Sequence, residues 1–517
     1  MQTFTVRKAE VHSRHGLVAA QNYHAATAGA AVLARGGNAM DAAIVTALTL
    51  SVVEPWLSGV GGGGFLLHSD GATGEVATLD FNVVAAQDLD PFDYPLSGGD
   101  SGNWFAWPAV KDERNATGYH SIAVPGAVAG FAAALERFGT ISFAEALAPA
   151  IEHAERGLEI DWFAALSLAA DAAALAQFPA SAELLLDQGR APRPGDPGRP
   201  IYKPMPRKAS LLRRLAHAGA RDFYEGEIAR MLVADLEAGG SRIRLDDLAV
   251  YNPVWNQPLH GTYRSFEISA IPGLSGGPSF VQACAQLETS GLTGATSPAD
   301  AALIYADVIR EAYRVRLTRM GHAANPQVGC TTHLNVVDAS GNMVSLTNTL
   351  LSRFGSKVVL PQAGILMNNG IMWFDPRPGQ PNFMAPGTKP LANMCPLIVR
   401  RAGGPSLAMG AAGGRTIFPT LLQILSYVVD YGMTLEDAFH MPRIDASTPT
   451  IRVNTRAENS VVARIGSRHP VEIVEDTLYP TNFAVPSAVL RWPNGTNTGM
   501  AHHTSPWAGV AIGQGGA

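Results

Sequence analysis

Cysteine is scarce in this chain. Only three occur in 517 residues, at Cys284, Cys330 and Cys395. They are too few for a disulfide framework, and their spacing matches no zinc motif. The sequence therefore predicts neither a disulfide-stabilised scaffold nor a metal centre, and no motif indicates an organic cofactor.

Long apolar runs and clusters of basic residues are also missing. No uninterrupted apolar run approaches the ~20 residues that span a bilayer. The N-terminal segment MQTFTVRK has no apolar stretch after its charges, so no secretory signal is predicted. The net charge of −6 and the lack of a Lys/Arg cluster argue against nucleic acid or an anionic membrane as the main partner. We therefore expect a cytoplasmic protein that acts on small molecules.

The order of expected elements predicts an α/β fold. Hydrophobic residues make up 47% of the chain and charged residues 16%, as in a globular protein with a large core. Strands and helices alternate in blocks, which favours two sheets covered by helices on both sides, an αββα four-layer sandwich. Helices are expected at about 22–35, 38–54, 128–137, 142–156, 160–176, 207–238, 279 onwards, 300–319 and 416–431, and strands at about 76–81, 266–271, 396–401 and 406–410.

The stretch from Thr331 to Thr349 is predicted to be a β-hairpin. Apolar and β-branched residues flank an Asp/Ser/Gly/Asn turn, and reflection about Ser340 places Thr349 opposite Thr331. Two hydroxyls at the open end suit an N-terminal threonine nucleophile, provided that the chain is cut between Cys330 and Thr331. The freed α-amine, with a pKa of about 8, then takes the hydroxyl proton. Taken alone, the pattern is more often ordinary sheet.

Two glycine runs frame this hairpin. The run at 59–64 has no Lys-Ser/Thr after it and leads into a strand, so it is interpreted as a close-packing element rather than a phosphate loop. Gly413 and Gly414 stand at a strand-to-helix junction, where paired backbone N–H groups can stabilise an oxyanion.

Together these motifs resemble, in order and over nearly the whole chain, the γ-glutamyltransferase family of N-terminal nucleophile hydrolases. The resemblance implies the αββα sandwich and self-cleavage into a large subunit, 1–330, and a small subunit, 331–517. The two would form a heterodimer, and possible pairing of heterodimers stays open. It also implies that Thr331 is the nucleophile, that Thr349 orients it, and that Gly413 and Gly414 form the oxyanion site. The connection before Thr331 is shorter than is typical of the family.

The expected substrate pocket departs from γ-glutamyl enzymes. Asn82 replaces the arginine that holds the substrate's α-carboxylate, and Leu351 replaces an asparagine beside the hydroxyl of Thr349. The residues that hold the α-amine appear as Gly370 and Trp373, and the paired serines appear as Ala392 and Asn393. A buried ammonium without a partner costs several kcal/mol. We therefore expect poor binding of glutathione.

The remaining pocket has Trp373 and Leu351 as walls and Asn393 as a polar contact. Arg415 either clamps a carboxylate on a short acyl group or forms a structural salt bridge. Similar pockets occur in oxamate amidohydrolase and in cephalosporin acylases of the family. The first hypothesis is therefore an amidohydrolase for a small acidic amide such as oxamate. The alternatives are a cephalosporin or glutaryl acylase, a γ-glutamyl hydrolase or transferase, and a catalytically silent binding protein.

Other polar and aromatic residues receive structural interpretations. His333 shares a strand face with Thr331 and is given a supporting role, because the free amine already supplies the base. His502 and His503 are interpreted as packing or surface residues. The aromatics Trp104, Phe105 and Trp107 fit packing and a pocket wall equally well.

Overall fold

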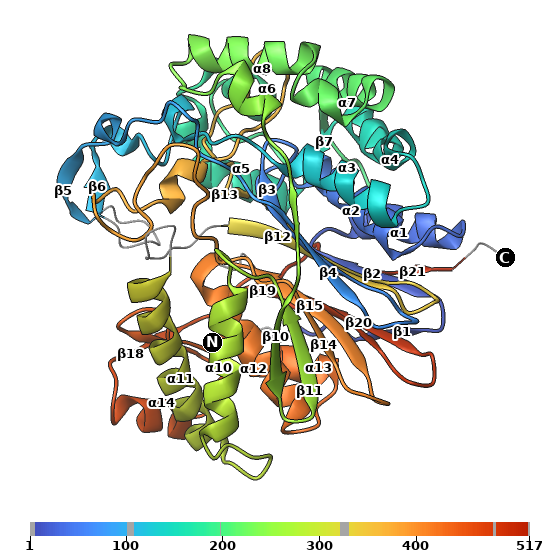
Figure 1. Ribbon diagram of the computed structural model, residues 1–517, viewed down its shortest axis with the longest axis vertical. Helices are drawn as coiled ribbons and strands as arrows, with labels where there is room; N and C mark the ends of the chain where they lie inside the picture. The colour runs from blue at the N-terminus through green and yellow to red at the C-terminus, as the bar shows by residue number, and fades with distance from the viewer. Residues whose placement is uncertain (1–5, 101–107, 197, 321–329, 479–481, 515–517) are drawn as a thin grey trace.

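Two seven-stranded antiparallel sheets lie face to face in the computed structural model, which describes residues 6–100, 108–196, 198–320, 330–478 and 482–514 (Figure 1). The first sheet has the strand order β21 (Gly509–Gly513), β2 (Gly16–Ala20), β12 (Cys330–Val337), β13 (Met343–Leu351), β3 (Gly63–Ser69), β4 (Val76–Phe81) and β9 (Val254–Asn256). The second has the order β1 (Val11–Ser13), β20 (Asn497–Ala501), β19 (Val485–Arg491), β15 (Ser406–Ala412), β14 (Leu397–Arg400), β11 (Phe266–Ala270) and β10 (Leu259–Tyr263).

Helices cover the outer face of each sheet (Figure 1). The helices on the side of the first sheet are α1 (Tyr23–Ala34), α2 (Ala39–Val53), α3 (Ala127–Phe138), α4 (Phe143–Arg156), α5 (Trp162–Leu175), α6 (Pro179–Leu185), α7 (Pro206–Ala218), α8 (Glu227–Ala238) and α9 (Leu245–Ala249). Those on the second are α10 (Gly277–Thr289), α11 (Pro298–Arg319), α12 (Ile417–Val429), α13 (Leu435–His440) and α14 (Asn459–Gly466). The predicted αββα sandwich is confirmed.

Small strands complete the molecule. They form a three-stranded sheet of β16 (Ile444–Asp445), β17 (Ile451–Asn454) and β18 (Val471–Val474), and the pairs β5 (Leu96–Asp100) with β6 (Pro108–Val110) and β7 (Leu158–Glu159) with β8 (Tyr202–Lys203).

Three apolar clusters hold the four layers together. One lies between the first sheet and its helices, a second between the other sheet and its helices, and a third between the two sheets. On β12, Leu334 and Val336 face the helices, whereas Val337, next to the turn, belongs to the inner cluster. This alternation follows from the period of two in a strand.

Local signals in the sequence account for the first two helices. Gly36, with φ of +91°, follows α1, and Asn38 caps α2 by accepting hydrogen bonds from the N–H groups of Met40 and Asp41. Asp41 in turn accepts from the N–H of Asn38, which completes a capping box. The long stretch at 207–238 differs from the expectation, because Gly219, with φ of +84°, ends α7 and a 3₁₀ turn precedes α8.

From Thr332 to Val337 the hairpin has the predicted register, whereas the predicted pairing of Thr331 with Thr349 is not among the strand pairs. Thr332 pairs with Asn348 and Val337 with Met343, so the strands reflect about Ser340. The register shifts by one between Cys330 and Thr332, and Cys330 therefore lies opposite Leu351. Thr331 stands at this irregularity.

The glycine run at 59–64 allows close backbone packing. A Cβ atom on Gly62 would lie 2.0 Å from the carbonyl oxygen of Thr349, and one on Gly64 would lie 2.0 Å from that of Thr347. A Cβ on Gly61 would lie 2.3 Å from the carbonyl oxygen of Leu366. The close-packing interpretation is confirmed: these glycines let β3 approach β13.

We expect Gly64→Ala to destabilise the protein by ~3 kcal/mol, because the new methyl group overlaps the backbone of β13 and the ring of Phe81. The control is Gly466→Ala at the end of α14, where the nearest atom to an added Cβ is 3.9 Å away. That change is expected to be neutral or slightly stabilising, because alanine favours helices. Urea unfolding measures both, and equal stability of the two variants would contradict the packing argument.

Candidate active site

The hairpin brings the open end of β12 beside the end of β13. Cys330 and Thr331 lie on the backbone of β12, while their side chains and the connection 321–329 lie outside the described residues. Thr349 is buried on β13, and its hydroxyl oxygen accepts a hydrogen bond of 2.8 Å from the N–H of Leu351. The predicted roles of Cys330, Thr331 and Thr349 stay predictions.

The segment after β13 has unusual backbone geometry. Leu351, Phe354 and Lys357 all have positive φ, at 84°, 57° and 68°. Such conformations cost of order 1–3 kcal/mol for a non-glycine residue and often accompany functional sites. Backbone hydrogen bonds hold this segment. The N–H of Leu350 donates to the carbonyl of Leu57, and the N–H of Phe354 donates to the carbonyl of Trp56.

Gly413 and Gly414 end the central strand of the opposite sheet. They have φ of 135° and 61°, and they join β15 to η6 (Gly414–Thr416) and then α12. Neither backbone N–H donates a hydrogen bond within the described part of the chain, whereas the carbonyl of Gly413 accepts from Thr416 at 2.8 Å. A pair of unused N–H groups before a helix is suited to bind an oxyanion.

Four of the predicted substrate-binding residues are buried and carry an unpaired N–H group. These are Nδ2 of Asn82, Nε1 of Trp373, Nδ2 of Asn393 and Nε of Arg415, for which the described residues offer no partner. Buried polar groups are usually paired, and each unpaired one costs about 1–3 kcal/mol. All four are donors, so a group rich in acceptor oxygens would satisfy them.

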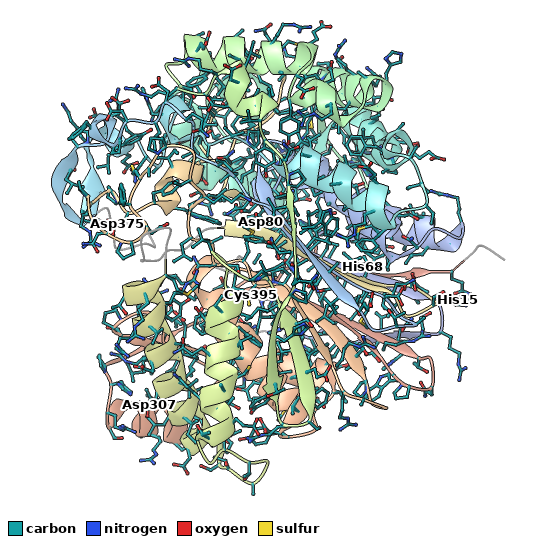
Figure 2. The ribbon with its side chains drawn as sticks, in the orientation of Figure 1. His15, His68, Asp80, Asp307, Asp375 and Cys395 are labelled. Carbon is teal, nitrogen blue, oxygen red and sulfur yellow. The ribbon has the colours of Figure 1, made fainter. Side chains whose placement is uncertain are left out.

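Several of the predicted pocket residues pack in or next to the apolar cluster between the sheets, whereas Arg415 packs on Tyr313 of the second cluster. Leu351, Trp373 and Ala392 belong to the inner cluster, which also contains Val83, the neighbour of Asn82. Asp80 on β4 forms an ion pair of 2.9 Å with Lys389. Figure 2 labels Asp80 on β4 and Cys395 just before β14, on the two facing sheets.

Arg415 is held by structural contacts. Its guanidinium donates to the carbonyl of Ser447 and lies 5.1 Å from the ring centre of Tyr313. The hydroxyl of Tyr313 donates to the carbonyl of Arg415. These contacts hold Arg415 in place, and its buried Nε has no hydrogen-bond partner among the described residues. Its predicted role in binding a carboxylate stays a prediction.

Arg316 is a buried residue that sequence reasoning missed. It donates to the carbonyls of Ser275 and Ala392 at 2.7 Å and to Oδ1 of Asn393 at 3.2 Å. Burial lowers the pKa of its guanidinium to about 10. Its position on the buried face of α11, three residues after Tyr313, was the available signal. Arg316 fixes the orientation of the Asn393 amide.

Asn368 was missed as well. Its buried side chain donates to the carbonyls of Gly61 and Ala123 at 2.8 Å and accepts from the N–H groups of Ala123 and Gly370. It therefore ties the glycine run to η5 (Gly370–Trp373), which carries Trp373. An Asn-Asn-Gly sequence resembles an ordinary turn, so no local signal marked it.

The histidines have structural roles. Nδ1 of buried His333 lies 2.9 Å from the hydroxyl of Thr347, and burial lowers the pKa of His333 to about 3. His502 and His503 are buried rather than exposed, and His502 contacts Thr504 at 2.7 Å.

Three further observations concern cofactors, membranes and aromatics. Among the described residues, no group of three or more His, Cys, Asp or Glu side chains could hold a metal ion. In the same residues, no helix combines the length and apolar character needed to cross a membrane. Trp104, Phe105 and Trp107 lie outside the described residues.

Comparison with known proteins identifies the family. The gamma-glutamyltranspeptidase model matches residues 25–328 and 315–501. The acylase ACY 1 proenzyme of Pseudomonas sp. (strain SE83) is 31% identical, with 98% of this chain and 96% of the relative covered. The glutathione hydrolase proenzyme of Bacillus subtilis (strain 168) is 28% identical, with 96% and 92% covered.

Solved structures agree on the fold. A cephalosporin acylase from Bacillus halodurans superposes with a TM-score of 0.82 at 24% identity, over 99% of this chain and 98% of that one. Together the two family matches run from residue 25 to residue 501, and the two relatives cover 98% and 96% of this chain. This chain is therefore an amide-bond hydrolase that belongs to the gamma-glutamyltranspeptidase family.

Proposed function

We propose that the chain cuts itself between Cys330 and Thr331 and then hydrolyses an amide whose acyl part carries a carboxylate. In the first step the hydroxyl of Thr331 attacks the carbonyl of Cys330, and the acyl group moves from nitrogen to oxygen. Water hydrolyses the resulting ester. The products are a carboxylate on Cys330 and a free α-amine on Thr331. The position of Thr331 at the register shift and the proenzyme relatives support this step.

In turnover, the α-amine of Thr331 takes the proton of its own hydroxyl as the oxygen attacks the substrate carbonyl. The departing amine receives that proton, and an ester remains on Thr331. Water then attacks the ester and releases the acid. The N–H groups of Gly413 and Gly414 are proposed to bind the oxyanion in both halves, and Thr349 to orient the nucleophile.

The unpaired donors of Asn82, Trp373, Asn393 and Arg415 carry the choice of substrate. A carboxylate offers about four acceptor sites and no donor, so it is the kind of group that satisfies unpaired N–H groups. These side chains are almost fully buried, which favours a small acyl group. The proposed substrate is therefore a small acidic amide of the oxamate type.

A second candidate is a glutaryl-type acylase. The acylase relative spans almost the whole chain, and a glutaryl group also ends in a carboxylate. A γ-glutamyl group differs from glutaryl only by an α-amine. That amine would meet Gly370 and the indole of Trp373, neither of which can accept a hydrogen bond from it through a polar side chain.

We expect the intact mass of the wild-type protein to show two fragments that join at Cys330–Thr331. Thr331→Ala removes the attacking oxygen and should leave one uncut chain, whereas Thr331→Ser keeps an oxygen and should still be cut. A wild-type protein that stays uncut would contradict self-cleavage.

Four amides test the substrate class. Hydrolysis of oxamate is measured by the release of ammonia. The other three are the p-nitroanilides of glutaric acid, γ-glutamic acid and butyric acid. One of the two carboxylate substrates without an α-amine should be best. We expect kcat/KM for the γ-glutamyl compound to be at least ~30-fold below that for the glutaryl compound, because an unpaired ammonium costs about 2 kcal/mol or more. Preference for the γ-glutamyl compound would refute the pocket assignment.

Asn393→Asp tests the contribution of the pocket's charge. The new carboxylate keeps the hydrogen bond to Arg316, so the fold should survive. It replaces a donor by a negative charge, and we expect KM for an anionic amide to rise at least ~10-fold. The butyryl compound is the neutral control and should be hydrolysed as by the wild type. An equal effect on both substrates would show a structural defect instead.

A further inference from the structure

Behind β12 lies a buried carboxyl group that the proposed chemistry does not use. Glu54 follows α2 directly and is almost completely buried. Its Oε2 lies 3.4 Å from the hydroxyl of Thr332, the residue next to Thr331. The same hydroxyl lies 3.3 Å from Oε1 of Gln21, which follows β2. Glu54, Thr332 and Gln21 thus form a short polar chain on the helix side of the sheet.

The number of available protons indicates whether Glu54 is protonated in this series of hydrogen bonds. A threonine hydroxyl donates one hydrogen bond, while Oε1 of Gln21 and an ionised Glu54 can only accept. With Glu54 ionised, one acceptor stays unpaired. With Glu54 protonated, Glu54 donates to Thr332 and Thr332 donates to Gln21, so the chain is complete.

A turned amide of Gln21 is the alternative arrangement. It would give Nε2, which now lacks a partner, a contact with Thr332. It would also leave Glu54 as a buried carboxylate with one hydrogen bond, because the nearby ammonium group of Lys208 donates to the carbonyl of Ser51 instead. Because a buried unpaired charge is far more costly than an unpaired amide, the protonated chain is favoured.

The charged surroundings of Glu54 agree with this assignment. The pKa of Glu54 is raised to about 8, mainly by burial; the hydrogen bond with Thr332 opposes the rise, and the nearby charge of Asp161 contributes to it. Lys208 on α7 contacts the same helix end but donates to the carbonyl of Ser51.

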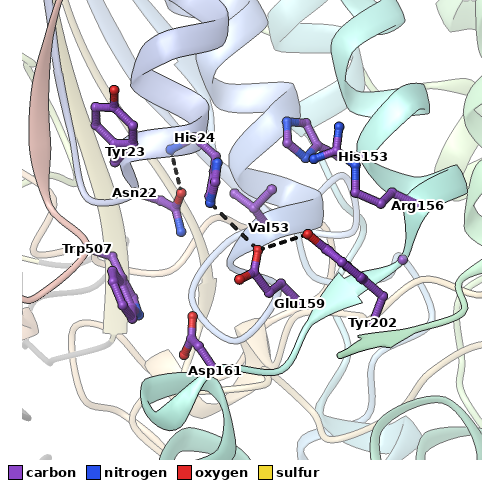
Figure 3. A pocket seen from close by; sticks show the side chains of 11 residues that line it. Asn22, Tyr23, His24, Val53, His153, Arg156, Glu159, Asp161, Tyr202 and Trp507 are labelled. Atoms are coloured by element: carbon purple, nitrogen blue, oxygen red, sulfur yellow. Dashed lines mark hydrogen bonds and ion pairs between the residues drawn. The ribbon is translucent and has the colours of Figure 1, made fainter. Parts of the chain in front are cut away.

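A pocket of about 140 Å³ lies beside this turn, with Val53 and Asp161 in its wall (Figure 3). Oε2 of Glu159 lies 3.8 Å from Nε2 of His24 and 3.4 Å from the hydroxyl of Tyr202. The other polar and charged side chains around the pocket are Asn22, Tyr23, His153, Arg156 and Trp507. Glu54 itself is not among the residues that line this pocket.

The turn that begins at Glu54 also contacts the other strand of the hairpin. The carbonyl of Leu57 accepts from the N–H of Leu350 at 3.0 Å, and that of Trp56 accepts from Phe354 at 2.7 Å. The turn 54–57 therefore contacts β12 through Thr332 and the end of β13 through its backbone. It thus contacts both strands of the hairpin near the end where Thr331 lies.

We propose that Glu54, in its protonated form, is a positioning residue that holds Thr332 and thereby fixes the backbone at the register shift where Thr331 lies. This inference rests on the proposed function of Thr331. Ionisation of Glu54 breaks the polar chain, so both self-cleavage and turnover should decline at alkaline pH. Glu54 contacts neither the substrate nor the reacting atoms in this scheme.

The test is the pH profile of amide hydrolysis, measured from pH 6 to 10 on the best substrate. The wild type should rise as the α-amine of Thr331 loses its proton and fall as Glu54 ionises. Glu54→Gln keeps a neutral donor to Thr332, so it should retain kcat and lose the alkaline fall. Asp161→Asn removes a neighbouring negative charge, and the fall should move to lower pH.

Thr332 supplies a second, independent pair of variants. Thr332→Val should lower kcat at least ~10-fold with little change in KM, and Thr332→Ser should restore it. The matched control is Thr49→Val, which removes a buried hydroxyl on α2 that donates to the carbonyl of Val45. This control should keep the wild-type profile.

Stability gives a readout that does not depend on activity. A carboxyl group whose pKa is raised in the folded state contributes stability that is fully present below its unfolded pKa, near 4.5, and is lost as pH rises towards 8. Glu54→Gln should therefore raise the melting temperature more at pH 8 than at pH 5.

The outcomes separate the two proposals. A wild-type protein that neither cuts itself nor hydrolyses any of the amides would overturn both. A wild type that is cut and active, with Glu54→Gln showing the same alkaline fall or Thr332→Val showing unchanged kcat, would overturn only the role of Glu54.

Discussion

The close approach of two backbones at the glycine run organises this molecule. Gly62 and Gly64 contact the carbonyls of Thr349 and Thr347 at distances that admit no side chain. This contact places β13 between β12 and β3, at the centre of the first sheet. Because Asn368 bonds the same run from the other side, η5 and its tryptophan are fixed relative to the hairpin. The candidate site is thus assembled from rigid elements, as precise catalysis requires.

The residues predicted to bind the substrate combine tight packing with incomplete hydrogen bonding. Arg316 is fully bonded at both terminal nitrogens and holds the loop that carries Asn393, while Arg415 is packed on Tyr313. Around them, several N–H donors stay unpaired. A folded protein tolerates this cost where a ligand later supplies the acceptors. The same region contains Leu351 with its positive φ, so strain and unpaired donors coincide at one place.

The two faces of β12 have different tasks in the mechanism that we propose. One face points between the sheets, where Gly413 and Gly414 end β15. The other faces α2, where Glu54 and Gln21 flank Thr332. Since neighbouring residues of a strand point to opposite faces, a residue without access to substrate can still control the backbone of its neighbour. In this proposal, the protonation state of Glu54 on the helix side of β12 affects catalysis by Thr331 through the backbone.

The sequence by itself determined the layers, the helix caps, the hairpin register and the order of the site motifs. These features depend on periodicity, on glycine and on short-range hydrogen bonds, which are visible in neighbouring residues. Only the tertiary structure decided which buried groups meet. Glu54 and Thr332 are far apart in the chain, as are Arg316 and Asn393, and Arg415 proved to contact Tyr313 and Ser447. Such pairings depend on how whole sheets and helices pack, because hydrogen bonding and desolvation act through space rather than along the chain.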